Sequence, residues 1–317
     1  MLGRSHTLAS MTATVGFRGP RRPATPGALA GLVLLAALPP VLQEPVVPFR
    51  AEVDIVDLTA TVTDRDGRFV AGLLETDFVV YDDGVPQPLT RFHQEREPVS
   101  LGLLLDASGS MERAKLQAAQ SALENLVVTH LPPADELFFV EFGYSASLTQ
   151  EWTTDRNLIR SALRAVRATG DTALYDAVAL AIPTAQSGRH RKKALLVVSD
   201  GNDSRSVLSL EELREELRRS DVLVYALGID ATGQDRAERV DAGALRRITD
   251  PTGGRTEIVG GIQYIDGAVA RIADELGRQY RLSYARQGAR DGRWHAIRVE
   301  VRKPGHDVRA RAGYLAN

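Results

Sequence analysis

The sequence predicts an α/β fold, with a doubly wound, mostly parallel sheet and flanking β-rich segments that form a small sheet or sandwich. Continuous apolar runs at residues 101–105, 194–198 and 222–227 are typical of strands buried on both faces. Segments with helical spacing of apolar residues separate these runs, and this alternation indicates a doubly wound sheet. Before and after this region, apolar and polar residues alternate, which is typical of half-buried antiparallel strands.

The size and composition of the chain exclude several classes of protein. Its 317 residues are 44% hydrophobic and 25% charged, as in an ordinary globular protein with one large or two smaller domains. A net charge of -2 lacks the basic excess expected of a nucleic-acid binder. There is no cysteine, so disulfides, thiolate metal sites and cysteine nucleophiles are excluded.

The N-terminus contains the parts of a secretory signal. Three arginines between residues 18 and 22 precede an apolar run at 28–38, and two prolines follow the run. This run of 11 residues is shorter than the roughly 20 that a membrane-spanning helix needs. We therefore expect residues 1–42 to be a signal peptide or a retained membrane anchor. The protein is then exported, to the periplasm, the cell surface or the medium, and it contacts a membrane only through this segment if it is uncleaved.

Residues 43–97 are expected to form an N-terminal β segment. A Pro-rich stretch at 43–49 is typical of a linker. Apolar residues then alternate with polar ones over 53–62, and a second strand is predicted at 78–81. Asp-Gly pairs follow both strands, and such pairs between apolar runs indicate hairpin turns.

Residues 98–280 are expected to form the α/β domain. Its predicted strands are 101–105, 137–140, 194–198 and 222–227, and its predicted helices are 112–129, 157–168, 173–186, 210–217, 242–248 and 262–280. Residues 281–317 form a C-terminal β segment, with alternation over 280–284 and 297–301. Each β segment alone is too short to bury a core, so we expect the two to pair around the inserted α/β domain.

The loop after the first buried strand is a candidate metal site. Asp106, Ser108 and Ser110 are two residues apart, so in an extended loop their side chains point the same way. The carboxyl end of a strand in an open α/β sheet is where such folds bind ligands. Carboxylate and hydroxyl oxygens suit Mg²⁺ better than zinc or copper. The alternative for this loop is that it caps the helix beginning near Glu112.

Two further loops raise the probability of a metal site. The run Gly170-Asp171-Thr172 opens a predicted helix, and Ser199-Asp200-Gly201 follows another buried strand. A parallel sheet brings the carboxyl ends of its strands to one edge. We therefore expect Thr172 and Asp200 to lie beside the first loop.

The order of these three motifs resembles the von Willebrand factor A (VWA) domain. It comprises D-x-S-x-S from Asp106, G-x-T-A-L-Y-D-A from Gly170 and S-D-G-x-D from Ser199, and the resemblance extends over about residues 98–280. The flanking β segments are similar to those of bacterial proteins described as VWFA-related. The motifs match the family's metal-ion-dependent adhesion site (MIDAS). The resemblance implies direct contact with the metal by three hydroxyls and largely water-mediated contact by two carboxylates, these residues being Ser108, Ser110, Thr172, Asp106 and Asp200.

The resemblance also implies the ligands of this site. The ion is Mg²⁺, or Mn²⁺ or Ca²⁺, and its open position takes an Asp or Glu carboxylate of a protein partner. Asp171 stands where the family often has glycine, and its charge leaves the usual acidic partner in question. We expect Asp171 to turn outward and cap the helix beginning near Ala173; otherwise it strengthens cation binding from a second shell. Asp203 either supports Asp200 through water or caps a loop or helix.

We therefore expect a metal-dependent protein-binding or adhesion module outside the cytoplasm, and not an enzyme. The sequence contains no nucleotide-binding, nucleophile-elbow or zinc-protease motif, and no histidine close in sequence that would activate Ser108 or Ser110. Two alternatives remain: an accessory subunit of an ATPase or chelatase-type complex, and a Mg²⁺-dependent hydrolase. His295 and His306 lie in predicted strands without ligand spacing and are interpreted as structural.

Overall fold

The structure of the protein is a computed structural model that describes residues 54–111, 113–168, 170–230, 240–286, 288 and 290–316. The predicted signal or anchor at residues 1–42 and the Pro-rich stretch after it lie outside the described residues. None of the described helices has the length and apolar character that crossing a bilayer requires.

A six-stranded sheet forms the centre of the α/β region, and its strand order is β10-β9-β8-β5-β6-β7. These strands are β5 (Val99–Asp106), β6 (Glu136–Phe142), β7 (Ala146–Thr153), β8 (Lys192–Ser199), β9 (Leu223–Ile229) and β10 (Thr256–Val259). The first five strands in this order pair with one another in parallel, and β7 runs antiparallel along β6. Every residue of β5 is buried, as its continuous apolar run predicts. The predicted doubly wound, mostly parallel sheet is confirmed.

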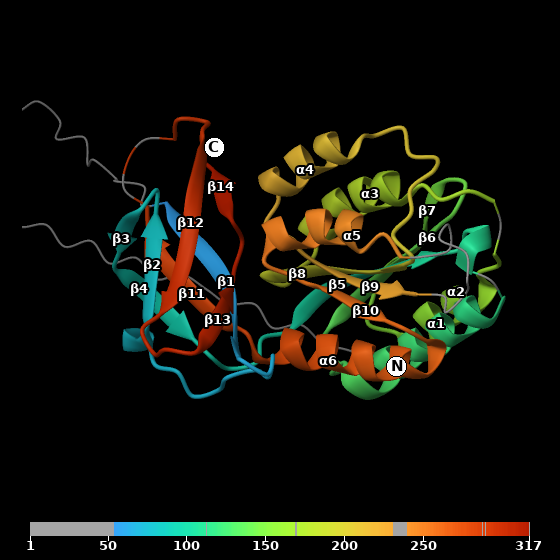
Figure 1. Cartoon of the computed structure of the whole chain (residues 1–317), viewed down its shortest axis with the longest axis horizontal. Coiled ribbons are helices and arrows are strands. Elements are labelled where there is room, and N and C mark those ends of the chain that lie inside the picture. Colours follow the sequence, from blue (N-terminus) through green and yellow to red (C-terminus); the bar gives the residue numbers. More distant parts are fainter. Residues whose placement is uncertain are drawn as a thin grey trace, which may run out of the picture. The chain divides into compact units, whose positions relative to one another are not determined.

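Helices cover both faces of this sheet (Figure 1). One face packs against α3 (Leu174–Gln186), α4 (Leu210–Arg219) and α5 (Ala242–Thr249), and the other against α1 (Arg113–Asn125), α2 (Arg156–Ala165) and α6 (Ile265–Arg278). Leu103 and Leu105 of β5 face the second group, while Leu104 faces the first. Gly102 is required in the same strand because a Cβ there would collide with the ring of Phe138.

Several predicted elements differ from the observed ones. The edge strands β7 and β10 were not predicted, because β7 is mostly polar and β10 has only four residues. The predicted helix 262–280 is shorter in the structure, where a 3-10 turn at Ile262–Tyr264 precedes α6. A π-helix continues α1 over Leu126–His130, and other short 3-10 turns lie at Glu75–Asp77, Gly109–Met111 and Asp250–Thr252.

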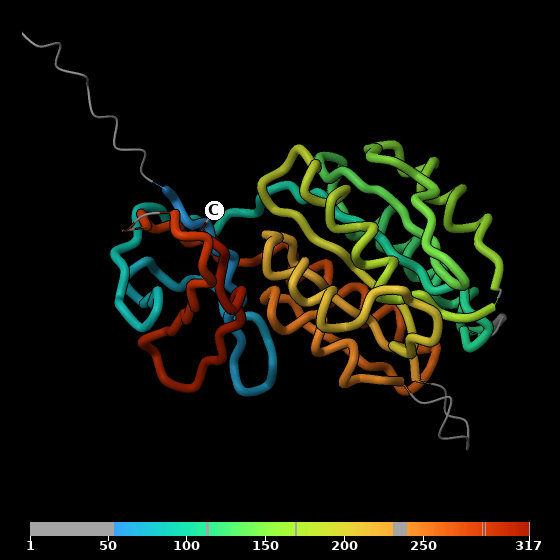
Figure 2. The backbone as a smooth tube through the Cα atoms, turned by 90° about the horizontal axis from the view of Figure 1, so that it is seen from above, coloured from blue at the N-terminus to red at the C-terminus, as the bar shows by residue number. Residues whose placement is uncertain are grey.

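The remaining strands form two four-stranded sheets, ordered β13-β1-β11-β4 and β14-β12-β2-β3. They are β1 (Ile55–Asp64), β2 (Phe78–Asp82), β3 (Val85–Gln87), β4 (Leu89–His93), β11 (Tyr280–Ala285), β12 (Trp294–Val301), β13 (His306–Arg309) and β14 (Gly313–Leu315). Strands from the two ends of the described chain pair antiparallel, β1 with β11 and β2 with β12. In Figure 2 the blue beginning of the described chain accordingly lies among the red segments near its end. Leu58, Val80 and Leu282 belong to one shared core, so the two sheets form a sandwich.

A buried carboxylate joins the sandwich to the six-stranded sheet. The Oε1 atom of Glu275, on α6, accepts hydrogen bonds from Tyr225 on β9 (2.9 Å) and from Thr61 on β1 (3.3 Å). Its Oε2 atom lies 2.7 Å from Arg309 on β13 and 3.3 Å from Arg255. Both oxygens therefore have partners, which a buried charge requires.

A buried lysine predicts a pH dependence of stability. The Nζ atom of Lys192 donates to the carbonyl of Leu276 (2.9 Å), and burial lowers the pKa of Lys192 from 10.5 to about 8. Since the unfolded chain holds this proton more tightly, stability is reduced below pH 8 and rises as the pH increases towards 10.5. From pH 7 to pH 10, the free energy of unfolding of the wild type is expected to rise by about 2 kcal/mol more than that of Lys192→Met. Urea denaturation at both pH values measures this difference, and equal stability changes in the two proteins would contradict it.

Candidate metal centre

Asp106 is held at the junction of two neighbouring strands. It ends β5 and is 0% exposed. Its Oδ1 atom accepts from the backbone N–H of Ser108 (2.8 Å), and its Oδ2 atom accepts from the hydroxyl of Ser199 (2.6 Å). Ser199 ends β8, which pairs in parallel with β5 so that Leu105 lies opposite Val198. Both carboxylate oxygens are therefore oriented before any ligand arrives.

Ser108 and Ser110 present a pair of hydroxyls beside this carboxylate. Their Oγ atoms are 3.0 Å apart, with Ser108 buried and Ser110 partly exposed. The buried ammonium of Lys115 donates to the carbonyl of Ser110 (3.0 Å), which fixes the loop from the side of α1. A shared hydrogen bond between two hydroxyls leaves lone pairs on both oxygens for a cation.

Hydrogen bonds hold the loop of Thr172 against the other two loops. The N–H of Gly109 donates to the carbonyl of Gly170 (2.9 Å), where a positive φ of 69° favours glycine. On the other side, the carbonyl of Thr172 accepts from the N–H groups of Ser204 and Arg205, both at 3.0 Å. The structure therefore brings together the three loops that carry the predicted site residues.

Asp200 carries an unsatisfied buried atom. This residue is 0% exposed, and its Oδ1 atom accepts from the N–H of Asn202 (3.1 Å). Its Oδ2 atom is buried and has no hydrogen-bond partner among the described residues. Burial, with a contribution from the charge of Asp200, raises the pKa of Asp106 to about 6. Two adjacent buried carboxylates, one with a free oxygen, fit a bound cation, because a cation offsets both the desolvation and the repulsion.

The two residues predicted for a second shell have different surroundings. Asp171 is exposed, but the expectation that it caps α3 is wrong, because the N-cap position is Ala173, which makes no side-chain cap. The capping bond comes from Asp203, whose Oδ2 atom accepts from the N–H of Tyr175 (3.0 Å). The carboxylate of Asp203 also binds the N–H and hydroxyl of Ser206, so it ties two loops together.

Sequence reasoning did not single out the residues around the site. Ser199 orients Asp106 but was noted only as part of a motif. Tyr144 is 58% exposed, and the guanidinium of Arg205 lies 4.3 Å from the centre of its ring and bonds its hydroxyl. Val207 is 91% exposed in the following turn. Aromatic residues and arginine are enriched at protein interfaces, so the exposed pair of Tyr144 and Arg205 fits a contact surface.

Comparison with known proteins gives the same fold. Residues 101–202 match the family model described as von Willebrand factor type A domain. An uncharacterized protein of Synechocystis sp. is 30% identical over 171 residues, which cover 50% of this chain and 40% of the relative. The match therefore spans less than half the length of that relative.

Two solved structures share the fold at low sequence identity. A von Willebrand factor type A protein from Catenulispora acidiphila is 15% identical with a TM-score of 0.50, covering 83% of this chain and 75% of that one. Proximal thread matrix protein 1 from the mussel byssus, with a zinc-occupied MIDAS motif, is 17% identical with a TM-score of 0.50. That match covers 62% of this chain and 50% of the byssus protein.

Proposed function

We propose that this chain, whose residues 101–202 match the von Willebrand factor type A domain, is a metal-dependent module for protein binding or adhesion. The observation that carries the proposal is the buried Oδ2 atom of Asp200, which lies beside the buried Asp106 and has no hydrogen-bond partner among the residues that the structure describes. A divalent cation would satisfy the first and offset the charge of both. The loops that present these groups lie at the carboxyl edge of the sheet, where open α/β folds bind ligands.

The residues that would hold the ion are all oxygen donors. We assign direct contacts to Ser108, Ser110 and Thr172, and largely water-mediated contacts to Asp106 and Asp200. This set suits Mg²⁺, with Mn²⁺ or Ca²⁺ as substitutes. The zinc in the MIDAS motif of the byssus protein supports divalent occupancy of such a site. When bound, the ion supplies an electron-poor position that favours an anionic oxygen, and we propose that an Asp or Glu carboxylate of a protein partner takes it.

The hydrogen bonds of the site favour binding over catalysis. The hydroxyl of Ser199 donates a hydrogen bond to Asp106, and the hydroxyls of Ser108 and Ser110 share a hydrogen bond. Neither arrangement gives a serine the imidazole or amine base that activates a nucleophile. We further propose that the protein acts outside the cytoplasm, which rests on the signal predicted at residues 1–42.

The test is capture of partners from the envelope of the producing cell by the immobilised mature protein. Capture is compared in Mg²⁺, in chelator, and with Asp106→Ala in Mg²⁺. Partners retained in Mg²⁺ and lost in the other two conditions support the proposal. Equal retention in all three conditions would refute a metal-bridged contact.

Arg205, beside the candidate metal site, is expected to contribute to binding of the partner but not to binding of the metal. Because Arg205 is exposed, stacks on Tyr144 and carries a positive charge, Arg205→Ala is expected to weaken binding of an acidic partner by about 10-fold, mainly through slower association. Affinity for Mg²⁺ itself should change little. Surface plasmon resonance at two salt concentrations measures the first effect, and calorimetric Mg²⁺ titration the second. The matched control is Arg298→Ala, which removes a similar stack on Tyr81, 4.1 Å from the ring centre.

A further inference from the structure

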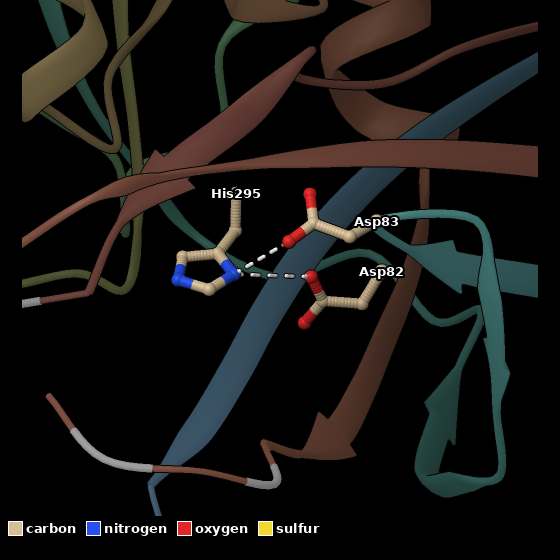
Figure 3. A group of neighbouring side chains, drawn as sticks. All are labelled: Asp82, Asp83 and His295. Carbon is tan, nitrogen blue, oxygen red and sulfur yellow. Dashed lines mark ion pairs between the residues drawn. The ribbon is translucent and has the colours of Figure 1, made fainter. Parts of the chain in front are cut away.

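Three potential metal ligands converge in the sandwich, far from the loops of the MIDAS motif in the sequence. Asp82 ends β2, Asp83 begins the turn to β3, and His295 lies on β12, which pairs with β2. The Nδ1 atom of His295 is 2.9 Å from Oδ2 of Asp83 and 3.8 Å from Oδ1 of Asp82, as Figure 3 shows. One atom from each residue lies within 4.8 Å of the others.

In both carboxylates, the oxygen that does not face His295 already accepts hydrogen bonds. Oδ2 of Asp82 accepts from the hydroxyls of Tyr284 and Tyr314, both at 2.8 Å. Oδ1 of Asp83 accepts from the N–H of Ala296 (2.8 Å). The two converging carboxylate oxygens are therefore fixed in orientation by bonds to the other oxygen of each carboxylate, as in a preorganised metal site.

The histidine ring is oriented in the same way. Its Nε2 atom lies 3.2 Å from Oδ1 of Asp291, and the ring stacks on Tyr314 with centroids 5.3 Å apart. A histidine that donates one ring N–H to a carboxylate and offers its other nitrogen to an ion is the usual arrangement at metal sites. Asp291 therefore orients the imidazole ring of His295.

The strongest independent sign of a ligand is the Oδ1 atom of Asp82. The residue is only 9% exposed, and this oxygen is buried with no hydrogen-bond partner in the described part of the chain. It points towards the imidazole in Figure 3, but 3.8 Å is too long for a hydrogen bond. A proton on Nδ1 would bond Asp83 and leave this oxygen unsatisfied, whereas an ion between the three atoms would contact all of them.

We propose that Asp82, Asp83 and His295 form a second metal site, for Zn²⁺ or a divalent transition ion of similar chemistry. One imidazole nitrogen with two carboxylate oxygens is a ligand set that such ions accept, with the fourth position open. Two ligands about 2.1 Å from a tetrahedral ion are about 3.4 Å apart. The observed separations of 2.9 and 3.8 Å lie on either side of that value.

The ion would tie the turn between β2 and β3 to β12. Asp83 has a φ of 48°, a conformation that asparagine tolerates, so Asp83→Asn removes a ligand charge without forcing the turn to change. This variant is the primary test. His295→Gln is the second variant, and the matched control is His93→Gln, the same substitution at an exposed histidine on β4.

The experiment is calorimetric titration of the metal-stripped full-length protein with Zn²⁺. Wild type and His93→Gln are expected to bind one ion more than Asp83→Asn and His295→Gln. Asp106→Ala should keep this ion, which separates the site from the proposed Mg²⁺ site. Asp291→Asn should weaken this binding by roughly 10-fold to 100-fold.

Pulsed electron paramagnetic resonance with Cu²⁺ identifies the ligand type. Coupling to an imidazole nitrogen is expected in wild type, His93→Gln and Asp106→Ala, because the Asp106 site contains only oxygen donors, and it should be lost in His295→Gln. The proposal is overturned if Asp83→Asn and His295→Gln bind as many Zn²⁺ ions as wild type with unchanged affinity. It is also overturned if the nitrogen coupling survives in His295→Gln.

Discussion

Asp106→Asn is expected to weaken Mg²⁺ binding by about 100-fold while the metal-free protein stays folded. Asparagine keeps the shape of Asp106 and an oxygen for the N–H of Ser108, but it removes one of two adjacent buried charges. Without the ion, that loss relieves repulsion from Asp200. With the ion bound, the loss removes the attraction between this carboxylate and the cation. The substitution is therefore expected to stabilise the metal-free protein and to destabilise the metal-bound protein.

Thermal unfolding with and without Mg²⁺ separates these effects. Wild type should melt at a higher temperature in Mg²⁺, since a ligand that binds only the native state stabilises it, and Asp106→Asn should show almost no such shift. Asp171→Asn is the matched control, because it makes the same change at an exposed neighbour and should lose little affinity. An Mg²⁺ shift of wild-type size in Asp106→Asn would contradict the assignment of this carboxylate.

Glu275→Ala is expected to reduce the free energy of unfolding by about 3–5 kcal/mol. The buried carboxylate has partners on three sides: Tyr225 in the six-stranded sheet, and Thr61 and Arg309 in the sandwich. Removing it leaves the buried phenol of Tyr225 without its acceptor and takes the carboxylate from Arg309, whose guanidinium then keeps only its bond to the carbonyl of Gly254 among the described residues. Each unpaired buried polar group costs stability because it has lost water without gaining a replacement bond.

Urea denaturation followed by circular dichroism measures this loss. Asp274→Ala is the control on the same helix, since its carboxylate is about half exposed and, among the described residues, forms an ion pair with Arg278 alone. That pair should contribute less than about 1 kcal/mol. Similar losses in the two variants would show that the buried network does not stabilise the native state.

Local patterns in the sequence were sufficient for the central fold. Continuous apolar runs predicted the buried strands β5, β8 and β9, because a strand covered on both faces needs apolar residues at every position. The same rule could not find β7, whose inner residues alternate with polar ones at the edge of the sheet. Edge strands are half solvated, so their sequences carry a weaker signal.

In the candidate site, too, local sequence patterns predicted some features and missed others. Strand ends and motif spacing were enough to place the loops of Asp106, Thr172 and Asp200 together, since parallel strands share a carboxyl edge. The cap of α3 was assigned to the wrong residue, because Asp203 reaches the helix from another loop. When the capping residue comes from a loop that is distant in the sequence, the residues next to the helix do not indicate it.

The loop from Asp106 to Ser110 was therefore determined by the sequence, down to the oxygen donors it presents. Only the tertiary structure decided that one oxygen of Asp200 has no partner among the described residues and that His295 has Asp82 and Asp83 beside it. The histidine was interpreted as structural because the sequence around it has no ligand spacing, and Asp82 and Asp83 lie more than 200 residues away in the chain. The physical reason is that β12 pairs with β2 across the whole inserted domain, and pairing between distant strands is set by the packed core they share and not by local sequence.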